Sequence, residues 1–311
     1  MKWWKKSILE GLKYTGQTQR TIPFEMVYWA HYLHPKPLNP RIKDEKHPLC
    51  LSSPYLPNPN VEKNENGADE KLKGKILDVL EDQMDKIFLN EDMSLNFSGI
   101  TDLMIKHFFN DLNKYYMETI KNSNGEQQLV KDVLRNNLAR VLEKHQKKKI
   151  CLIAHSMGSI IAYDVLTQTL PDISIDTFIT IGSPLGIPVV ISRIAKEQKK
   201  RKVKTPDSVT RNWINLSDLG DKVAMNYNLA DDYWNNKRKI KVIDKTVFNN
   251  YEANGKRNPH KSYGYLRTPE IAETIHKFLN QEEARRKNKL VQIIKKFFLV
   301  KIIRNKCEAN K

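Results

Sequence analysis

Apolar residues recur at helical spacing in several stretches of the first half of the chain. The spacing is clear in residues 3–14, which precede Gly16, and in residues 71–89 and 127–147. Residues 100–120 have the same character with aromatic faces, enough for one or two helices. Each stretch gathers its apolar side chains on one side, so the pattern predicts amphipathic helices over these four ranges.

The pattern changes after residue 148. Residues 149–154, 177–181 and 213–216 are short, continuous apolar runs, which are typical of strands buried on both faces. Helical spacing follows the first run at residues 159–169 and returns at residues 269–279. Strands that alternate with helices predict the α/β fold class, with a mostly parallel sheet and helices on both of its faces.

Two segments near the N-terminus lack helical spacing. Residues 24–33 are rich in aromatic and β-branched side chains, which predicts a strand. Residues 34–66 contain seven prolines, which indicates an irregular excursion. The span 34–146 is too long for a simple connection between sheet elements, and we interpret it as a largely helical or irregular insertion or cap.

Length and composition fit a globular protein. The chain has 311 residues, of which 40% are hydrophobic and 29% are charged, and this excludes a chain that is disordered throughout. No stretch approaches 18 uncharged apolar residues, so no ordinary transmembrane helix is predicted. We expect one domain over residues 1–283 and a basic amphipathic tail over residues 284–311.

The net charge of +17 is concentrated in two places. Residues 284–311 carry ten Lys or Arg against one acidic residue, and residues 193–204 carry seven against one. The rest of the chain is nearly balanced. We interpret residues 193–204 as an exposed loop, and a nucleic-acid partner is disfavoured because neither aromatic interleaving nor a binding motif accompanies the charge.

The tail mixes basic and apolar residues, and two interpretations stay open. An interfacial helix on an anionic membrane is one. A terminal helix that packs on the domain, with its lysines in solvent, is the other.

The cysteines and the N-terminal sequence indicate in which cellular compartment the protein is expected. Cys50, Cys151 and Cys307 are odd in number and widely spaced, so they fit neither a disulfide framework nor a zinc site. A reducing compartment follows, and the N-terminus lacks the apolar run of a signal peptide. We expect a cytoplasmic protein, with peripheral membrane contact through the tail as a further option.

The strongest chemical motif is Ala154-His155-Ser156-Met157-Gly158, between a predicted buried strand and a predicted helix. Such a strand–turn–helix with small residues two places before and after a serine is a nucleophile elbow, and its tight turn requires those small residues. The following helix directs its positive N-terminal end at the serine. The Met157 N–H is therefore a candidate donor to an oxyanion.

A serine nucleophile requires a base and an orienting acid. An acid is expected after a later strand, and Asp221 follows the run 213–216, with Asp218 as the reserve. His260 lies in a loop before the last predicted helix and is the candidate base. Either aspartate is otherwise an ordinary turn residue or helix cap. His155 is interpreted as a structural residue or one that lines the pocket. Ser183 follows the run 177–181, and it either lines the pocket or is an ordinary turn residue.

Four segments carry a resemblance to a known family: LIAHSMGSIIAYDVL, ITIGSPLGIP, WINLSDLGDKVA and NPHKSYGYL. They resemble serine esterase or lipase-like members of the α/β-hydrolase superfamily, including lipase-like proteins related to GPI inositol deacylases. The resemblance covers residues 149–279. It implies Ser156 as nucleophile, His260 as base, Asp221 as acid, and acyl transfer to water without metal or cofactor.

One feature departs from that family. Its members open with a buried strand that ends in His-Gly, and the loop after it donates the second oxyanion N–H. No such segment precedes residue 3, so we expect a truncated N-terminus; the alternatives are a differently built oxyanion hole or an inactive relative. Loss of one donor costs on the order of a hundredfold in rate.

These observations predict a serine hydrolase that cleaves carboxylic esters, with a lipid-like substrate as the narrower expectation. One alternative is a catalytically silent hydrolase-fold protein that binds a partner or a membrane. Another is an acyltransferase that uses the same acyl-enzyme with an alcohol acceptor.

Overall fold

The computed structural model covers the chain with gaps, and the tail 284–311 and nearly all of the predicted helix 71–89 lie outside its described residues. The described residues are 2–17, 21–34, 36–39, 41–42, 49–51, 53–58, 88–96, 103–121, 124–224 and 226–281.

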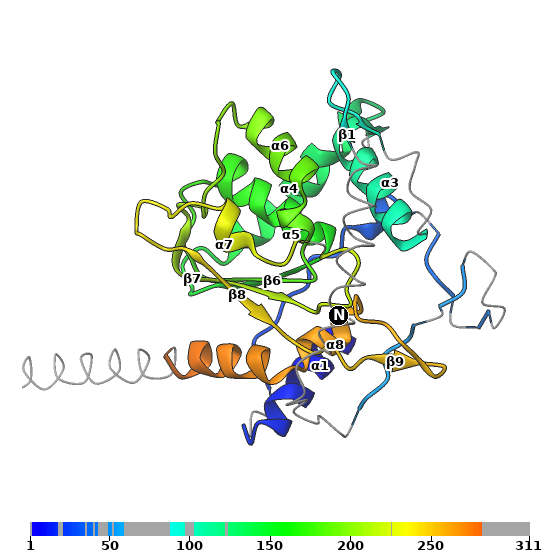
Figure 1. Cartoon of the computed structure of the whole chain (residues 1–311), viewed down its shortest axis with the longest axis vertical. Coiled ribbons are helices and arrows are strands. Elements are labelled where there is room, and N and C mark those ends of the chain that lie inside the picture. The colour runs from blue at the N-terminus through cyan, green and yellow to red at the C-terminus, as the bar shows by residue number, and fades with distance from the viewer. Residues whose placement is uncertain are drawn as a thin grey trace, which may run out of the picture.

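A four-stranded parallel sheet forms the centre of the molecule (Figure 1). Its strands lie in the order β5 (Cys151–His155), β6 (Ile175–Ile181), β7 (Val209–Ser217) and β8 (Val242–Thr246). The first three correspond to the three apolar runs, so the prediction of a parallel α/β sheet is confirmed. β8 was not predicted, because it is an outer strand with only Val242 buried and has no continuous apolar run.

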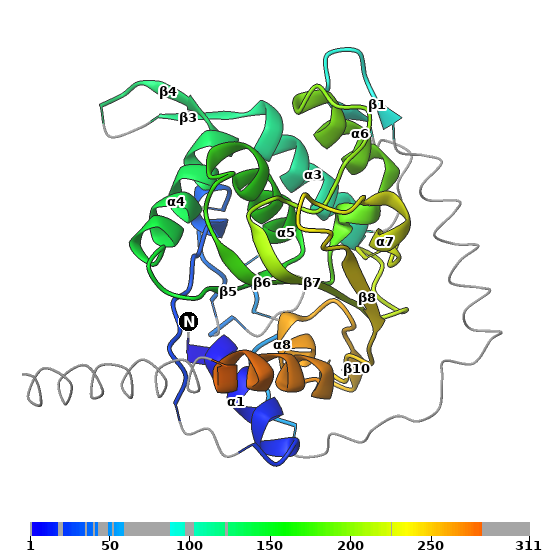
Figure 2. The ribbon, with the colours of Figure 1, turned by 90° about the vertical axis from the view of Figure 1, so that its left-hand side faces the viewer.

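Helices cover both faces of this sheet (Figure 2). One face carries α3 (Leu103–Met117), α4 (Val130–Lys144), α5 (Met157–Asp164) and α6 (Pro188–Glu197). The other carries α1 (Lys2–Tyr14), α8 (Ser262–Leu266) and a helix that begins at residue 269. The predicted helices at 3–14, 100–120, 127–147, 159–169 and 269–279 are confirmed with shifted ends.

Shorter elements complete the described chain. The π-helix Val165–Thr169 extends α5. The others are the 3-10 helices Ala30–Tyr32 and Pro184–Gly186, helix α7 (Leu229–Asp232), and the antiparallel pairs β1 (Phe88–Leu89) with β2 (Leu95–Asn96), β3 (Thr119–Lys121) with β4 (Gln127–Leu129), and β9 (Glu252–Ala253) with β10 (Lys256–Arg257).

Alternate residues of the inner strands enter two separate cores. Phe178 of β6 and Trp213 of β7 belong to the larger core, which holds the buried sides of α3, α4 and α5. Ile179 and Ile214 belong to the other, with the buried sides of α1 and of the helix after residue 268. Because both faces of β6 are buried, its sequence is apolar at consecutive positions rather than at alternate ones.

The predicted strand at residues 24–33 is wrong. Residues 21–29 have no strand partner, and the 3-10 helix Ala30–Tyr32 follows. Phe24 packs against the core under α1, whereas Val27 and Trp29 pack against the core under α4. The segment therefore crosses the edge of the sheet from one face to the other, and its apolar residues serve packing rather than strand pairing.

The predicted exposed loop at 193–204 is wrong in its first part. Arg193 and Ile194 belong to α6 and are buried. The Arg193 guanidinium lies 4.1 Å from the centre of the Tyr116 ring, and this stacking explains how a basic side chain is accommodated among apolar ones. Residues 199–202 are exposed.

A buried cluster of charged and polar side chains joins four helices of the larger core to one another. Arg135 of α4 donates to Asp164 of α5 at 2.6 Å and to Glu197 of α6 at 3.0 Å, and the Tyr115 hydroxyl of α3 also donates to Asp164. Asp164 thus stabilises the packing of these helices.

Among the helices described, none is long and apolar enough to cross a membrane.

Candidate active site

Ser156 stands on the sharp turn between β5 and α5. Its backbone has φ +53° and ψ −133°, a combination that is strained for a residue with a side chain. The Ser156 N–H donates to Ile181 O of β6 at 3.2 Å, and the Ser159 N–H donates to Ser156 O at 2.8 Å. These bonds to a strand and to a helix hold the strained turn.

Gly158 lies in the first turn of α5. Apart from its chain neighbours and the backbone of its own helix, a Cβ built on Gly158 meets only the indole nitrogen of Trp29, at 3.6 Å, which is ordinary contact.

The side chains of Ser156, His260 and Asp221 form one hydrogen-bonded chain. His260 Nε2 lies 3.0 Å from Ser156 Oγ, and His260 Nδ1 lies 2.9 Å from both carboxylate oxygens of Asp221. The three residues come from the end of β5, the loop after β7 and the loop before α8. The structure thus brings together the three residues that the sequence analysis singled out.

Asp221 is almost fully buried and has several donors. Besides His260, it accepts from the Val223 N–H at 2.9 Å and from the Tyr265 hydroxyl at 2.8 Å. Burial acts to raise the pKa of Asp221, but His260 and these hydrogen bonds outweigh it and lower the pKa. The carboxylate is therefore ionised beside the imidazole.

The reserve acid, Asp218, faces other partners. It is ion-paired with Arg257 and accepts from the Asn249 N–H at 2.6 Å and the Gly220 N–H at 2.8 Å. Burial raises the pKa of Asp218. Among the described residues, no contact joins Asp218 to His260. Asp218 therefore stabilises the loop and is not part of the hydrogen-bonded chain.

His155 supports the position of His260. Its Nε2 donates to His260 O at 2.8 Å, and the two ring centres lie 4.8 Å apart. Burial, with help from the charge of His260, lowers the pKa of His155 to about 3, so its ring is neutral at physiological pH. It also lines a groove described below.

Met157 and Ser183 lie near the turn in different ways. Met157 opens α5, so its N–H is one of the first helical N–H groups, which have no acceptor within the helix. Ser183 is buried, and its hydroxyl accepts from the Leu185 N–H at 3.3 Å. Ser183 does not line either of the two cavities described here.

Two residues of the site were given no role of their own in the sequence analysis. Gly182 has φ +52°, and a Cβ built on it lies 2.8 Å from Asp221 Oδ2 and 3.3 Å from His260 Nδ1, so no side chain fits. A glycine directly after a buried strand was the available signal. Tyr265, which donates to Asp221, carries no local signal because the two residues are 44 positions apart.

A large groove of about 1160 Å³ lies beside the outer side of β5. His155, Gly158, His260 and Lys261 line it at the end near the turn. Burial lowers the pKa of Lys261 to about 8. The remaining lining comes mainly from apolar side chains of β5, α1, α4 and residues 21–30.

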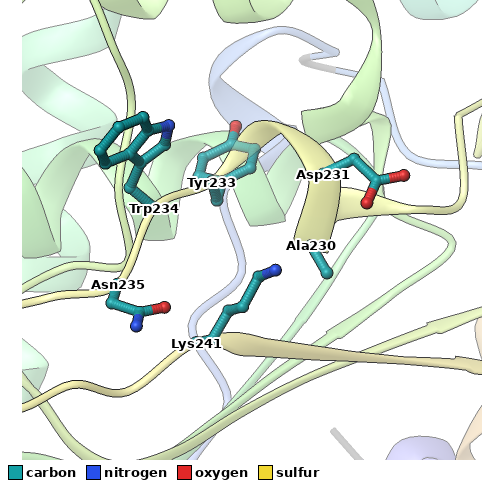
Figure 3. Close-up of a pocket in the computed structure, with 6 residues that line it drawn as sticks. All are labelled: Ala230, Asp231, Tyr233, Trp234, Asn235 and Lys241. Atoms are coloured by element: carbon teal, nitrogen blue, oxygen red, sulfur yellow. The ribbon is translucent and has the colours of Figure 1, made fainter.

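A second hollow of about 300 Å³ lies next to α7, and it includes no residue of the hydrogen-bonded chain (Figure 3). Its lining residues are Ala230, Asp231, Tyr233, Trp234, Asn235 and Lys241.

Comparison with known proteins gives one family. Residues 80–226 match the family model of the PGAP1-like alpha/beta domain, and this range includes Ser156 and Asp221 but not His260. No curated protein and no solved structure matches the chain. The match confirms the resemblance for the three segments that lie within this range, whereas NPHKSYGYL, at residues 258–266, lies outside it. Residues 80–226 therefore carry a PGAP1-like alpha/beta domain, of a lipase-like α/β-hydrolase family related to GPI inositol deacylase.

Proposed function

We propose that the protein is a serine hydrolase that cleaves carboxylic esters, with lipid-like esters as the substrate class. The observation that carries the proposal is the hydrogen-bonded chain from Ser156 through His260 to Asp221. The lipase-like family of residues 80–226 supports the same reaction class.

In the first half of the reaction, Ser156 Oγ attacks the ester carbonyl carbon while His260 Nε2 takes the hydroxyl proton. The carbonyl oxygen becomes an oxyanion, and the Met157 N–H donates to it from the start of α5. The tetrahedral intermediate then collapses. The ester C–O bond breaks, His260 returns its proton to the departing alcohol, and an acyl-Ser156 ester is left.

In the second half, water repeats the sequence. His260 takes a proton from the water, whose oxygen attacks the acyl-enzyme carbonyl. Ser156 Oγ leaves with the proton from His260, and a carboxylic acid is released. Asp221 accepts from His260 Nδ1 throughout, which fixes the tautomer with Nε2 free to accept and stabilises the imidazolium that forms.

Fluorophosphonate labelling with intact-mass detection tests this proposal. We expect a single adduct on the full chain and none on Ser156→Ala. The matched control is Ser183→Ala, at the carboxyl end of the neighbouring strand, which loses only the bond to Leu185 and should keep the adduct. A folded chain without an adduct, or an adduct that survives in Ser156→Ala, would overturn the proposal.

A further inference from the structure

Two exposed loops near the hollow beside α7 are strongly basic. Residues 199–202 and 237–241, which we call the basic loops, contain eight basic residues and no acidic one. All eight are exposed, and within the described part of the chain only Lys237 among them has an ion pair, with Asp207 at 3.8 Å. The eight are Lys199, Lys200, Arg201, Lys202, Lys237, Arg238, Lys239 and Lys241.

Hydrogen bonds hold the two basic loops side by side. The Trp234 N–H donates to Val203 O at 3.1 Å, and the Thr205 N–H donates to Trp234 O at 2.8 Å. The buried Asn236 amide donates to Pro206 O at 3.0 Å. The fold therefore fixes the backbone positions of the two loops relative to each other and concentrates their charge on one surface.

Each basic loop contains one lysine with a left-handed backbone. The φ angle is +51° at Lys199 and +62° at Lys239. Glycine or asparagine adopts such a conformation more easily than lysine does. Backbone geometry therefore does not explain the lysine at either position, whereas a requirement for positive charge on this surface does.

An exposed aromatic side chain lies on the same surface. Trp234 is 58% exposed, and Lys202 Nζ lies 3.7 Å from the centre of its ring. Residues 193–204 contain no aromatic residue, and the fold supplies one from the segment before β8. An aromatic ring among cations is the combination on which bases stack while phosphates bind the neighbouring lysines.

The hollow of about 300 Å³ surrounds this ring with groups of suitable chemistry. Its lining includes Trp234, Asn235, Lys241 and the exposed Asp231. In Figure 3 the Lys241 side chain extends toward the space between Trp234 and Asp231. The hollow thus offers a ring for stacking, an amide and a carboxylate for the edge of a base, and a cation for a phosphate.

We propose that the basic loops and the hollow bind single-stranded nucleic acid. One base stacks on Trp234 in the hollow and donates its exocyclic amine to Asp231, as cytosine and adenine can. The neighbouring phosphates bind the lysines and arginines of the basic loops.

This surface is remote from the hydrogen-bonded chain of the candidate active site. The basic loops precede β7 and β8, at the amino ends of these parallel strands, whereas Ser156 and Asp221 follow the carboxyl ends of β5 and β7. The inference therefore does not depend on the hydrolase activity proposed above.

Asp231 distinguishes nucleic acid from other anionic partners. An anionic membrane or an acidic peptide would also be attracted to the basic loops. In the hollow, however, its negative groups would meet the Asp231 carboxylate. A base is uncharged, stacks on Trp234 and donates to that carboxylate, so the lining of the hollow favours nucleic acid.

Fluorescence anisotropy of the full chain with labelled oligodeoxycytidylate of about 15 nucleotides tests the proposal. We expect saturable binding, and at least about fivefold weaker binding of oligodeoxyuridylate of the same length, which differs only at the hydrogen-bonding edge of each base. Asp231→Asn should remove this difference, because asparagine can accept from the amine of one base and donate to the carbonyl of the other.

Substitutions of Trp234 test the stacking. Trp234→Ala should weaken binding about tenfold, whereas Trp234→Phe should keep most of it. The matched control is Phe248→Ala. Phe248 is 46% exposed, and the Arg257 guanidinium lies 4.1 Å from the centre of its ring. It follows the carboxyl end of β8, so its removal should not change binding.

A double substitution tests the phosphate contacts. Lys202→Gln with Lys241→Gln should reduce the slope of log affinity against log salt by about 1.4, the value for two lost contacts to a single strand. The control is Lys2→Gln with Lys13→Gln, which removes the same charge from α1, on the opposite face of the sheet from α7. The basic residues 284–311 are present in every variant, so their charge cancels from the comparison.

Four results would overturn the proposal. The first is no oligonucleotide binding at low salt, and the second is binding that neither the Trp234 nor the lysine variants weaken. The third is a loss in the lysine variant with none in Trp234→Ala, or equal binding of the two oligonucleotides, either of which would mean that no base occupies the hollow. The fourth is equal affinity for polyglutamate or phosphatidylserine vesicles, which would make the basic loops a surface for any polyanion.

Discussion

The carboxyl end and the outer edge of β5 differ in how many of their polar groups have hydrogen-bond partners. At its carboxyl end, the site residues have partners: Asp221 has at least four hydrogen bonds and His260 is bonded on both ring nitrogens. Along its outer edge, Cys151, Ile153 and His155 have backbone groups with no partner among the described residues. The first region is preorganised without a ligand, whereas the second is a strand edge that borders an apolar groove in the described part of the chain.

The largest effect is expected from a substitution in the hydrogen-bonded site at the carboxyl end of β5. Asp221→Asn removes the charge that orients His260, and kcat for a p-nitrophenyl ester should fall on the order of 10³ to 10⁴-fold. The matched control is Asp218→Asn, in the same loop but paired with Arg257. It should lose stability and keep most of kcat in the folded fraction. Equal losses of kcat in the two folded variants would show that kcat depends on the conformation of the loop rather than on the charge of Asp221.

That pair of aspartates also shows where sequence reasoning ended. The two residues follow the same strand and are three positions apart, so spacing alone left both open. Only the fold shows that Asp221 faces His260 and that Asp218 faces Arg257. The elbow, by contrast, was predictable because strand, turn and helix are all encoded within residues 149–169.

The strands of the sheet were also predictable from the sequence only in part. β5, β6 and β7 were predictable because burial on two faces leaves continuous apolar runs in the sequence. β8 was not, since Asp244 and Lys245 interrupt its apolar residues. Residues 24–33 have the composition of a strand, but pairing depends on contacts far along the chain, and this segment crosses the sheet edge instead.

An intermediate effect concerns His155, which belongs to both regions. Its folded pKa of about 3 lies below the ordinary value of 6.5, so the unfolded chain binds the extra proton first. Stability is therefore lost as pH falls below about 6.5 and continues to fall toward about 3. Because part of the ring faces the groove, we expect about 1–2 kcal/mol from this residue between pH 7.5 and pH 5.

Urea unfolding at the two pH values measures this contribution. The loss of unfolding free energy on acidification should be smaller by that amount in His155→Asn than in the native chain. His107→Asn, at an exposed position of α3, should follow the native chain. An unchanged pH dependence in His155→Asn would mean that the His155 ring is not held neutral beside His260.

The smallest effect compares the two edges of the sheet directly. Ile243 of β8 is 51% exposed, so Ile243→Thr should change the unfolding free energy by less than about 0.5 kcal/mol. Ile153 of β5 packs against the core under α1, so the same substitution there should cost about 1 kcal/mol or more. Equal costs at the two positions, measured by urea unfolding, would mean that the contact of Ile153 with the core under α1 adds nothing to the stability of the chain.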